Sequence, residues 1–165
     1  MIDRMSVAEL TALIRVTSTR MELLLSQLSV EQFNQPGAVG VWSVKDVLVH
    51  IAFWERYAVN MLQAIARGKT PDLLADDETE RRNASVVTQY YQRPLAAVIS
   101  DWQEAREDLL EVLEDLDDED LNDPDRFAWS VGRTLLDRIA DNSFDHEQEH
   151  IEQIQAWMKS VTSDK

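Results

Sequence analysis

Cysteine is absent from this chain of 165 residues, which excludes disulfides, thiolate metal ligands and thiol nucleophiles. Glycine and proline are scarce, with four copies of each, and neither a glycine-rich phosphate-binding loop nor a G-x-S-x-G nucleophile motif is present. No apolar run approaches the roughly 20 residues of a membrane-spanning helix. No apolar secretory core follows the first residues. These absences predict a cytoplasmic protein that has no membrane partner.

Basic residues are few, with 16 lysines and arginines against 31 aspartates and glutamates, and the formal net charge is −15. Such a surface repels phosphate groups, and no lysine and arginine stripe compensates for it, so we expect no nucleic-acid partner. The acidity is densest at Asp117–Asp120 and continues to Asp125. A solvated turn between helices is expected there, since the ligand spacing of the alternative, a calcium loop, is missing.

The length fits one well-buried core, and we expect a single domain over residues 1–165. Apolar residues recur every three or four positions with few breakers, which predicts an all-α fold. Ser6 with Glu9 and Ser43 with Asp46 have the spacing of capping boxes. Four main helices are expected: one from Ser6, one from Ser43 to Gly68, one from Pro94 to Leu116, and one from after Ser130 to Trp157.

The segments between these helices differ in length. Residues 29–41 are predicted to be a connector, because Pro36, Gly37 and Gly40 interrupt them. Residues 69–93 are longer and include a polar, helix-like stretch at 76–92. We therefore predict a four-helix bundle with a long crossover connection between the second and third main helices.

Histidine occurs only three times, and two copies lie four residues apart, at His146 and His150. On a helix this spacing separates them by about 6 Å along the axis and roughly 40° around it. Both fall on the apolar stripe of the last predicted helix, and His50 lies on or beside the buried face of the second. An unpartnered buried imidazole costs about 2 kcal/mol or more. The three histidines are therefore predicted to share one divalent transition metal, such as zinc, nickel or iron.

Neighbouring residues are candidates for supporting roles. Asp46 and Asn142 each precede a histidine by four residues, and we expect them to orient the rings. Trp54 and Tyr57 follow His50 by four and seven residues, on its side of the helix.

The pentapeptide from His146 to His150 also matches the zinc-protease signature H-E-x-x-H, with Glu147 as general base. The context of that motif is missing, because only fifteen residues follow and no substrate-binding strand is predicted. The other alternative is a set of solvated or singly hydrogen-bonded histidines in a protein with an architectural role.

The segments that hold the histidines resemble a known family. Residues 42–50 with Trp54-Glu55 resemble the second helix of the DinB/YfiT-like superfamily, and residues 142–146 with His150, Gln153-Ile154 and Trp157 resemble its last helix. The break at Arg93-Pro94-Leu95 and the Ala156-Trp157 ending look most like its ClbS-like branch.

This resemblance implies a four-helix bundle whose metal is held by His50, His146 and His150. Relatives include metal-dependent thiol transferases and isomerases, and the ClbS-like branch includes a resistance protein that hydrolyses a reactive cyclopropane in a genotoxin. We therefore expect a metal-dependent transferase or hydrolase of small molecules, in detoxification or stress. The alternative is a bundle that sequesters a small molecule without turnover. A homodimer is a further expectation, since long helices and five tryptophans offer faces to bury.

Overall fold

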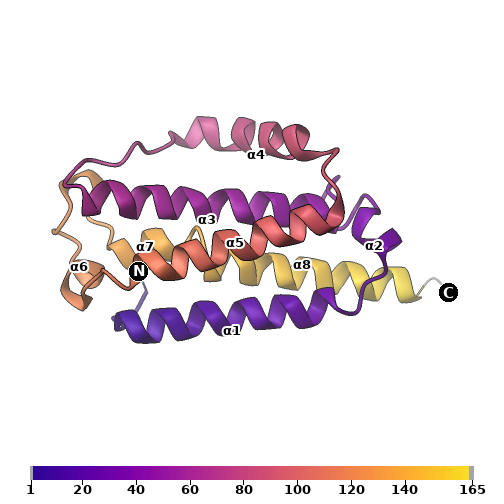
Figure 1. Cartoon of the computed structure of the whole chain (residues 1–165), viewed down its shortest axis with the longest axis horizontal. Coiled ribbons are helices and arrows are strands. Elements are labelled where there is room, and N and C mark those ends of the chain that lie inside the picture. Colours follow the sequence, from indigo (N-terminus) through magenta and orange to yellow (C-terminus); the bar gives the residue numbers. More distant parts are fainter. Residues whose placement is uncertain (1, 164–165) are drawn as a thin grey trace.

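The computed structural model describes residues 2–163, and its regular structure is helical (Figure 1). α3 packs along α5 and α1 along α8, while contacts of α3 with α8 and of α1 with α5 close the bundle. The predicted all-α bundle is confirmed. The predicted domain includes residues 1 and 164–165, which lie outside the described part of the chain. The long helices are α1 (Val7–Leu25), α3 (Val44–Ala66), α5 (Leu95–Leu113) and α8 (Phe144–Ser163).

The direction of the helices explains the long connection in the middle of the chain. Figure 1 shows α3 and α5 running in the same direction, with α4 (Asp76–Tyr90) returning between their ends. Two parallel neighbours cannot be joined by a tight turn, so the chain has to travel back along the bundle. The predicted crossover between the second and third main helices is confirmed.

Helix boundaries follow the local signals in the sequence. The Ser6 hydroxyl accepts from the backbone of Glu9, whose carboxylate accepts in return from the Ser6 backbone. Ser43 and Asp46 form the same reciprocal cap at the start of α3. Gly68, just after α3, has a φ of 66°, the left-handed conformation that ends many helices.

Two segments predicted as connectors contain short helices. Residues 29–41 include α2 (Val30–Asn34), because Ser29 and Gln32 form a capping box that starts a short helix before Pro36 and Gly37. The acidic turn includes α6 (Asp118–Asn122), whose N-cap is Asp117. Carboxylates in the first turn of a helix are stabilised by its unpaired N–H groups, so the acidic run favours this helix.

The prediction of one continuous last helix is wrong. The segment comprises a 3₁₀ turn η1 (Ala128–Ser130), then α7 (Leu135–Ala140), and α8 begins only at Phe144. Between α7 and α8, the Asn142 amide donates to the Arg138 carbonyl at 2.7 Å and the Ser143 hydroxyl to the Ile139 carbonyl at 2.6 Å. Short polar side chains that bond to backbone carbonyls compete with helix continuation, and two consecutive ones interrupt it here.

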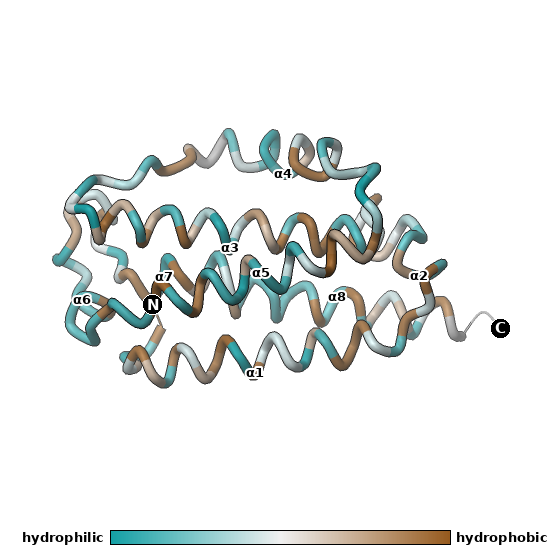
Figure 2. The backbone as a smooth tube through the Cα atoms, viewed as in Figure 1, coloured by the Kyte–Doolittle hydropathy of each residue, from teal (hydrophilic) through white to brown (hydrophobic). Residues whose placement is uncertain are grey.

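The core consists of two apolar clusters separated by a layer of polar side chains. One cluster surrounds Leu48 and Trp102, and the other surrounds Leu109 and Ile139. Figure 2 shows hydrophobic (brown) and hydrophilic (teal) residues alternating along each long helix, as expected for helices with one buried side. The polar layer is formed by Thr17, Glu55, Arg106 and Glu147, one from each long helix and all buried.

None of the helices in the described residues combines the length and hydropathy that crossing a membrane requires.

Candidate metal centre

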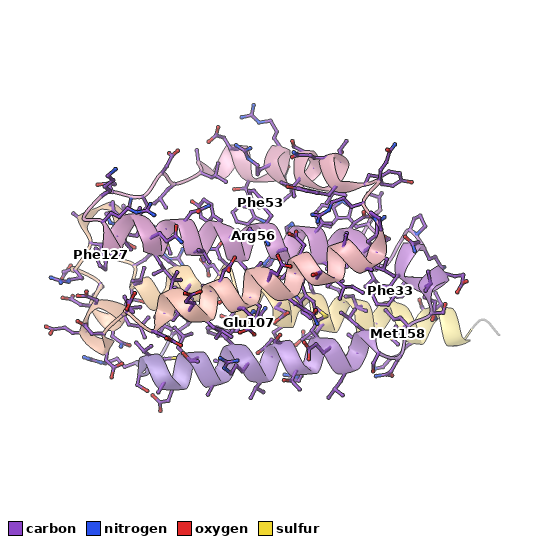
Figure 3. The ribbon with its side chains drawn as sticks, in the orientation of Figure 1. Phe33, Phe53, Arg56, Glu107, Phe127 and Met158 are labelled. Carbon is purple, nitrogen blue, oxygen red and sulfur yellow. The ribbon has the colours of Figure 1, made fainter. Side chains whose placement is uncertain are left out.

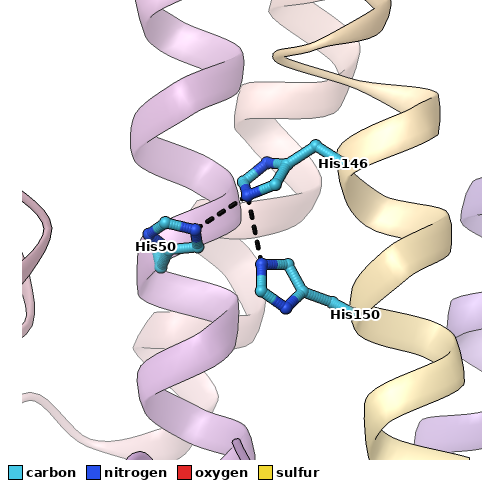
Figure 4. Close-up of side chains that lie close together, drawn as sticks. All are labelled: His50, His146 and His150. Atoms are coloured by element: carbon cyan, nitrogen blue, oxygen red, sulfur yellow. Dashed lines mark hydrogen bonds between the residues drawn. The ribbon is translucent and has the colours of Figure 1, made fainter. Parts of the chain in front are cut away.

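The three histidines of the chain lie together between α3 and α8 (Figure 4). Nε2 of His146 lies 2.8 Å from Nε2 of His50 and 3.1 Å from Nε2 of His150. His50 and His150 are buried, whereas His146 is half-buried. The convergence predicted from the spacing on α8 and from the apolar face of α3 is therefore present in the fold.

Local electrostatics keep these rings neutral. Burial lowers the pKa of His50 to about 2, the neighbouring rings of His146 and His150 add to this, and a side-chain hydrogen bond with Asn83 opposes it. Burial, followed by the charge of His150, lowers the pKa of His146 to about 3. The pKa of His150 is also lowered, mainly by burial. Neutral imidazole is the form that binds metals, so the site is prepared for ligation at ordinary pH.

The arrangement fits a divalent transition metal. One ligand atom from each histidine lies within 4.8 Å of the other two. Tetrahedral ligands at the usual zinc–nitrogen distance are about 3.3 Å apart, close to the shorter separations between these rings. Imidazole suits zinc, nickel, iron and copper, and three protein ligands leave a coordination position open. The group can therefore hold a metal ion that also contacts a small molecule.

One hydrogen bond determines which nitrogen of His150 is free to bind. Nδ1 of His150 lies 2.7 Å from Oε1 of Gln153, one turn further along α8. Because this oxygen can only accept, Nδ1 carries the hydrogen, and the Nε2 lone pair faces His146. Nδ1 of His146 is buried and has no hydrogen-bond partner within the part of the chain that the structure describes.

The residues expected to orient the rings have other partners. Asp46 accepts from the backbone and hydroxyl of Ser43 and thus serves the α3 cap. Asn142 donates to Arg138 at the break before α8, and it lines the cavity beside the histidines. Gln153, rather than Asp46 or Asn142, orients a ring, that of His150. The sequence indicates this role only through the spacing, because a side chain with a carbonyl lies three residues after a histidine on the same helix.

A cavity of about 440 Å³ opens beside the histidines. Trp54 and Tyr57 line it, as their positions on the His50 side of α3 predict. The Trp42 ring lies 4.9 Å from the His50 ring between centroids, and the Trp54 indole donates to the Asn83 amide at 2.9 Å. Asn83 comes from the polar helix α4, and nothing in the sequence indicated that α4 would reach the site.

Glu147 does not face this cavity. It is fully buried in the polar layer, where its Oε2 accepts from Nη2 of Arg106 at 2.9 Å. Arg106 also donates to Glu55, at 2.8 Å from Nε, and to the carbonyl of Ile14 at 3.4 Å. Since Glu147 is committed to a buried ion pair, the protease-like interpretation of H-E-x-x-H has no general base. Arg106 was itself detectable as a charged residue on the buried stripe between Trp102 and Leu109.

Comparisons with known proteins agree with this geometry. The fold is similar to that of an uncharacterised protein from Escherichia coli UTI89, with a TM-score of 0.81, 16% identity and 95% of each chain covered. It is similar to the colibactin self-resistance protein ClbS in complex with a dsDNA, with a TM-score of 0.80, 16% identity, and 93% of this chain and 96% of that one covered. A Streptococcus pneumoniae protein has a TM-score of 0.77 at 13% identity, with 96% of this chain and 93% of that one covered.

These identities establish a shared fold, and no curated protein matches the chain in sequence. A family model shows the family as well as the fold, because it matches residues 13–154, a span that contains His50, His146 and His150. The resemblance inferred from the histidine-bearing segments is thereby confirmed at the level of the superfamily. The chain belongs to the DinB superfamily.

Proposed function

We propose that this protein is a divalent-metal-dependent enzyme that acts on a small molecule, with His50, His146 and His150 as the metal ligands. The observation that carries the proposal is the convergence of three neutral imidazoles at the wall of an open cavity of about 440 Å³. Zinc, nickel or iron bound there supplies Lewis-acid chemistry to a transfer or hydrolysis reaction. Membership of the DinB superfamily supports the same interpretation.

The residues around the histidines have distinct tasks in this proposal. Gln153 holds His150 in the tautomer that presents Nε2 to the metal. Trp42 and Trp54 form apolar walls that pack against the substrate and keep bulk water from one side of the site. Asn83 and Arg138 contribute polar groups to the same cavity, where they can orient a substrate by hydrogen bonds.

A second candidate is binding without turnover. The likeness in fold to a self-resistance protein, ClbS, supports a role in detoxification or stress, and sequestration alone can protect against a toxic compound. In that case the cavity and the histidines hold a reactive small molecule one-to-one. Among the described residues that line this cavity, two carry a carboxylate: Glu149, and Asp141, which pairs with Arg133.

The two functions differ in stoichiometry. Protein loaded with zinc, nickel or iron is incubated with an excess of an epoxide, an activated cyclopropane or a maleimide, with and without a low-molecular-weight thiol. Mass spectrometry then follows the loss of the electrophile. Catalysis predicts many equivalents consumed per chain and loss of activity in His50→Ala. Gln148→Ala is the control, because Gln148 on α8 accepts from Arg20 on α1 and does not line the cavity. Consumption limited to one equivalent favours sequestration, and His50→Ala with full activity would contradict both.

Other expectations from the sequence extend the proposal. We propose a cytoplasmic protein of one domain that works as a homodimer and does not bind nucleic acid. The net charge of −15 supports the last point. ClbS was solved with a dsDNA, so this expectation needs a direct test.

A further inference from the structure

A separate cavity of about 610 Å³ lies on the other side of Tyr57 from the histidines, between α3, residues 69–74 and α4. This volume is in the range of small-molecule sites in proteins. One face of α3 forms its floor, as the three- and four-residue spacing of the lining side chains indicates. Figure 3 shows Phe53 between α3 and α4. The α3 side chains that line it are Phe53, Arg56, Tyr57, Asn60, Met61 and Ala64.

The cavity exists because α4 packs on α3 with only its second half. Val86 and Val87 are buried, at 5% and 8% exposure, and they hold this half of α4 against the bundle. Residues 78–85 are exposed or half-buried and carry no large apolar side chain. Residues 78–85 therefore place no large apolar side chain over the floor at Phe53.

The charges around this space have the opposite sign from the molecule as a whole. Among the described side chains that line it, Arg56, Lys69 and Arg82 are cationic and Asp72 is anionic, in a chain with a net charge of −15. Arg56 is held in place by Asp101, at 3.0 Å from Nη2 to Oδ1. The side chains of Lys69 and Arg82 make no ion pair or hydrogen bond with any residue that the structure describes, so both cationic groups are available to a ligand.

We propose that this cavity is a second binding site, for a small molecule with an apolar body and an anionic group such as a carboxylate or sulfonate. Phe53, Met61 and Ala64 contact the body, while Lys69 and Arg82 at the rim bind the anion. Charge complementarity identifies the ligand class, because an acidic protein otherwise repels anions. The ligand's negative charge and its apolar part are both needed, since the rim is cationic and the floor is apolar.

The site is adjacent to the candidate metal centre but does not depend on it. Tyr57 and Leu74 line both cavities, and the Tyr57 hydroxyl accepts from the Leu74 backbone N–H at 3.0 Å. This hydrogen bond fixes a wall between the two spaces. Ligand binding in the second site therefore requires none of the three histidines and no metal.

The test uses two fluorescent probes that differ in charge, 8-anilinonaphthalene-1-sulfonate and the uncharged N-phenyl-1-naphthylamine, on metal-free protein. In Lys69→Gln/Arg82→Gln, the dissociation constant of the sulfonate rises about tenfold, as expected for losing two exposed charge contacts. The uncharged probe binds this variant as it binds the wild type. Ala64→Trp fills the floor and weakens binding of both probes. Circular dichroism and the thermal midpoint verify that each variant is folded.

Two further variants locate the site. Arg67→Gln removes an exposed cation that lies outside this cavity, and it leaves sulfonate binding unchanged. His150→Ala also leaves it unchanged, so failure of the metal proposal would not affect this one. Equal sulfonate affinity in the wild type and the double variant would overturn the proposal. An equal loss of sulfonate affinity in Arg67→Gln, or a loss of sulfonate affinity in His150→Ala, would overturn the proposal as well.

Discussion

Arg106 and Glu147 form an ion pair inside the bundle, with Nη2 of the guanidinium 2.9 Å from Oε2 of the carboxylate. Glu147 directly follows His146 on α8, and Arg106 also donates to Glu55, which lies five residues after His50 on α3. α5 thus connects the two helices that carry the histidines. The polar layer lies behind the candidate metal centre, and it joins all four long helices through Arg106, which also bonds to the Ile14 carbonyl.

Removing Arg106 is expected to destabilise the fold strongly. Arg106→Met leaves Glu55 and Glu147 buried without a cation, and breaking a buried pair in this way costs about 3–5 kcal/mol in the free energy of unfolding. Urea denaturation followed by circular dichroism measures this loss. Arg126→Met is the matched control, because Arg126 pairs with Asp120 at the surface, where solvent screens the pair and its loss changes the free energy of unfolding little. Equal losses in the two variants would contradict the role of the polar layer.

Glu55 is expected to make stability depend on pH. Burial raises the pKa of Glu55 from 4.5 to about 8, with Arg106 opposing this and Glu147 adding to it. Between these two values the folded protein binds more protons than the unfolded chain, so this group's contribution to stability decreases as the pH rises. Glu55→Gln removes that decrease.

The measurement compares the free energies of unfolding of Glu55→Gln and the wild type over pH. From about pH 5 to about pH 9, the variant gains on the order of 4 kcal/mol relative to the wild type. Glu107→Gln, at an exposed position of α5, is the control for losing a surface carboxylate. A difference that stays constant over this range, or that falls, would show that Glu55 is ionised in the folded protein throughout.

Gln153 is expected to tune the affinity for metal without being a ligand. Its Oε1 accepts from Nδ1 of His150, and losing such a partner typically lowers metal affinity by about 10–100-fold. Competition with a chromophoric chelator measures the zinc affinity of Gln153→Ala. Gln148→Ala, which removes an amide from the same helix, leaves the affinity unchanged. Equal affinity in the wild type and Gln153→Ala would argue against this role.

Duplex DNA is expected not to bind. The net charge of −15 repels the phosphate backbone, and the cations at the second cavity are too few to neutralise a row of phosphates. Fluorescence anisotropy of a labelled duplex, at about 50 mM salt, is expected to stay constant on addition of the protein. Saturable binding whose affinity falls with added salt would show instead that a local cationic surface overcomes the net charge.

Much of the fold was accessible from the sequence because its signals are local. Helical periodicity and the caps at Ser6 and Ser43 predicted the long helices, and the length of residues 69–93 predicted the crossover. The four-residue spacing of His146 and His150, with His50 on another buried face, predicted their convergence. In each of these cases, residues that are close in sequence determine where a helix begins or which face of a helix a side chain occupies.

The parts that were missed depend on contacts between distant segments. The break before α8 arises from Asn142 and Ser143 bonding to the preceding turn, which competes with a periodicity that continues across it. Asn83 reaches the cavity only because α4 returns over α3. The buried pair of Glu55 and Arg106 required knowing which faces meet, since charged residues ordinarily lie at the surface.

The metal content of untagged protein tests the central claim most directly. Protein purified without a histidine tag and exposed to zinc, nickel and iron is dialysed and measured by elemental analysis. The account predicts about one equivalent of a divalent metal per chain, lost in His150→Ala while Gln148→Ala retains it. A wild-type protein that holds no metal under these conditions, or a metal content that His150→Ala leaves unchanged, would contradict it.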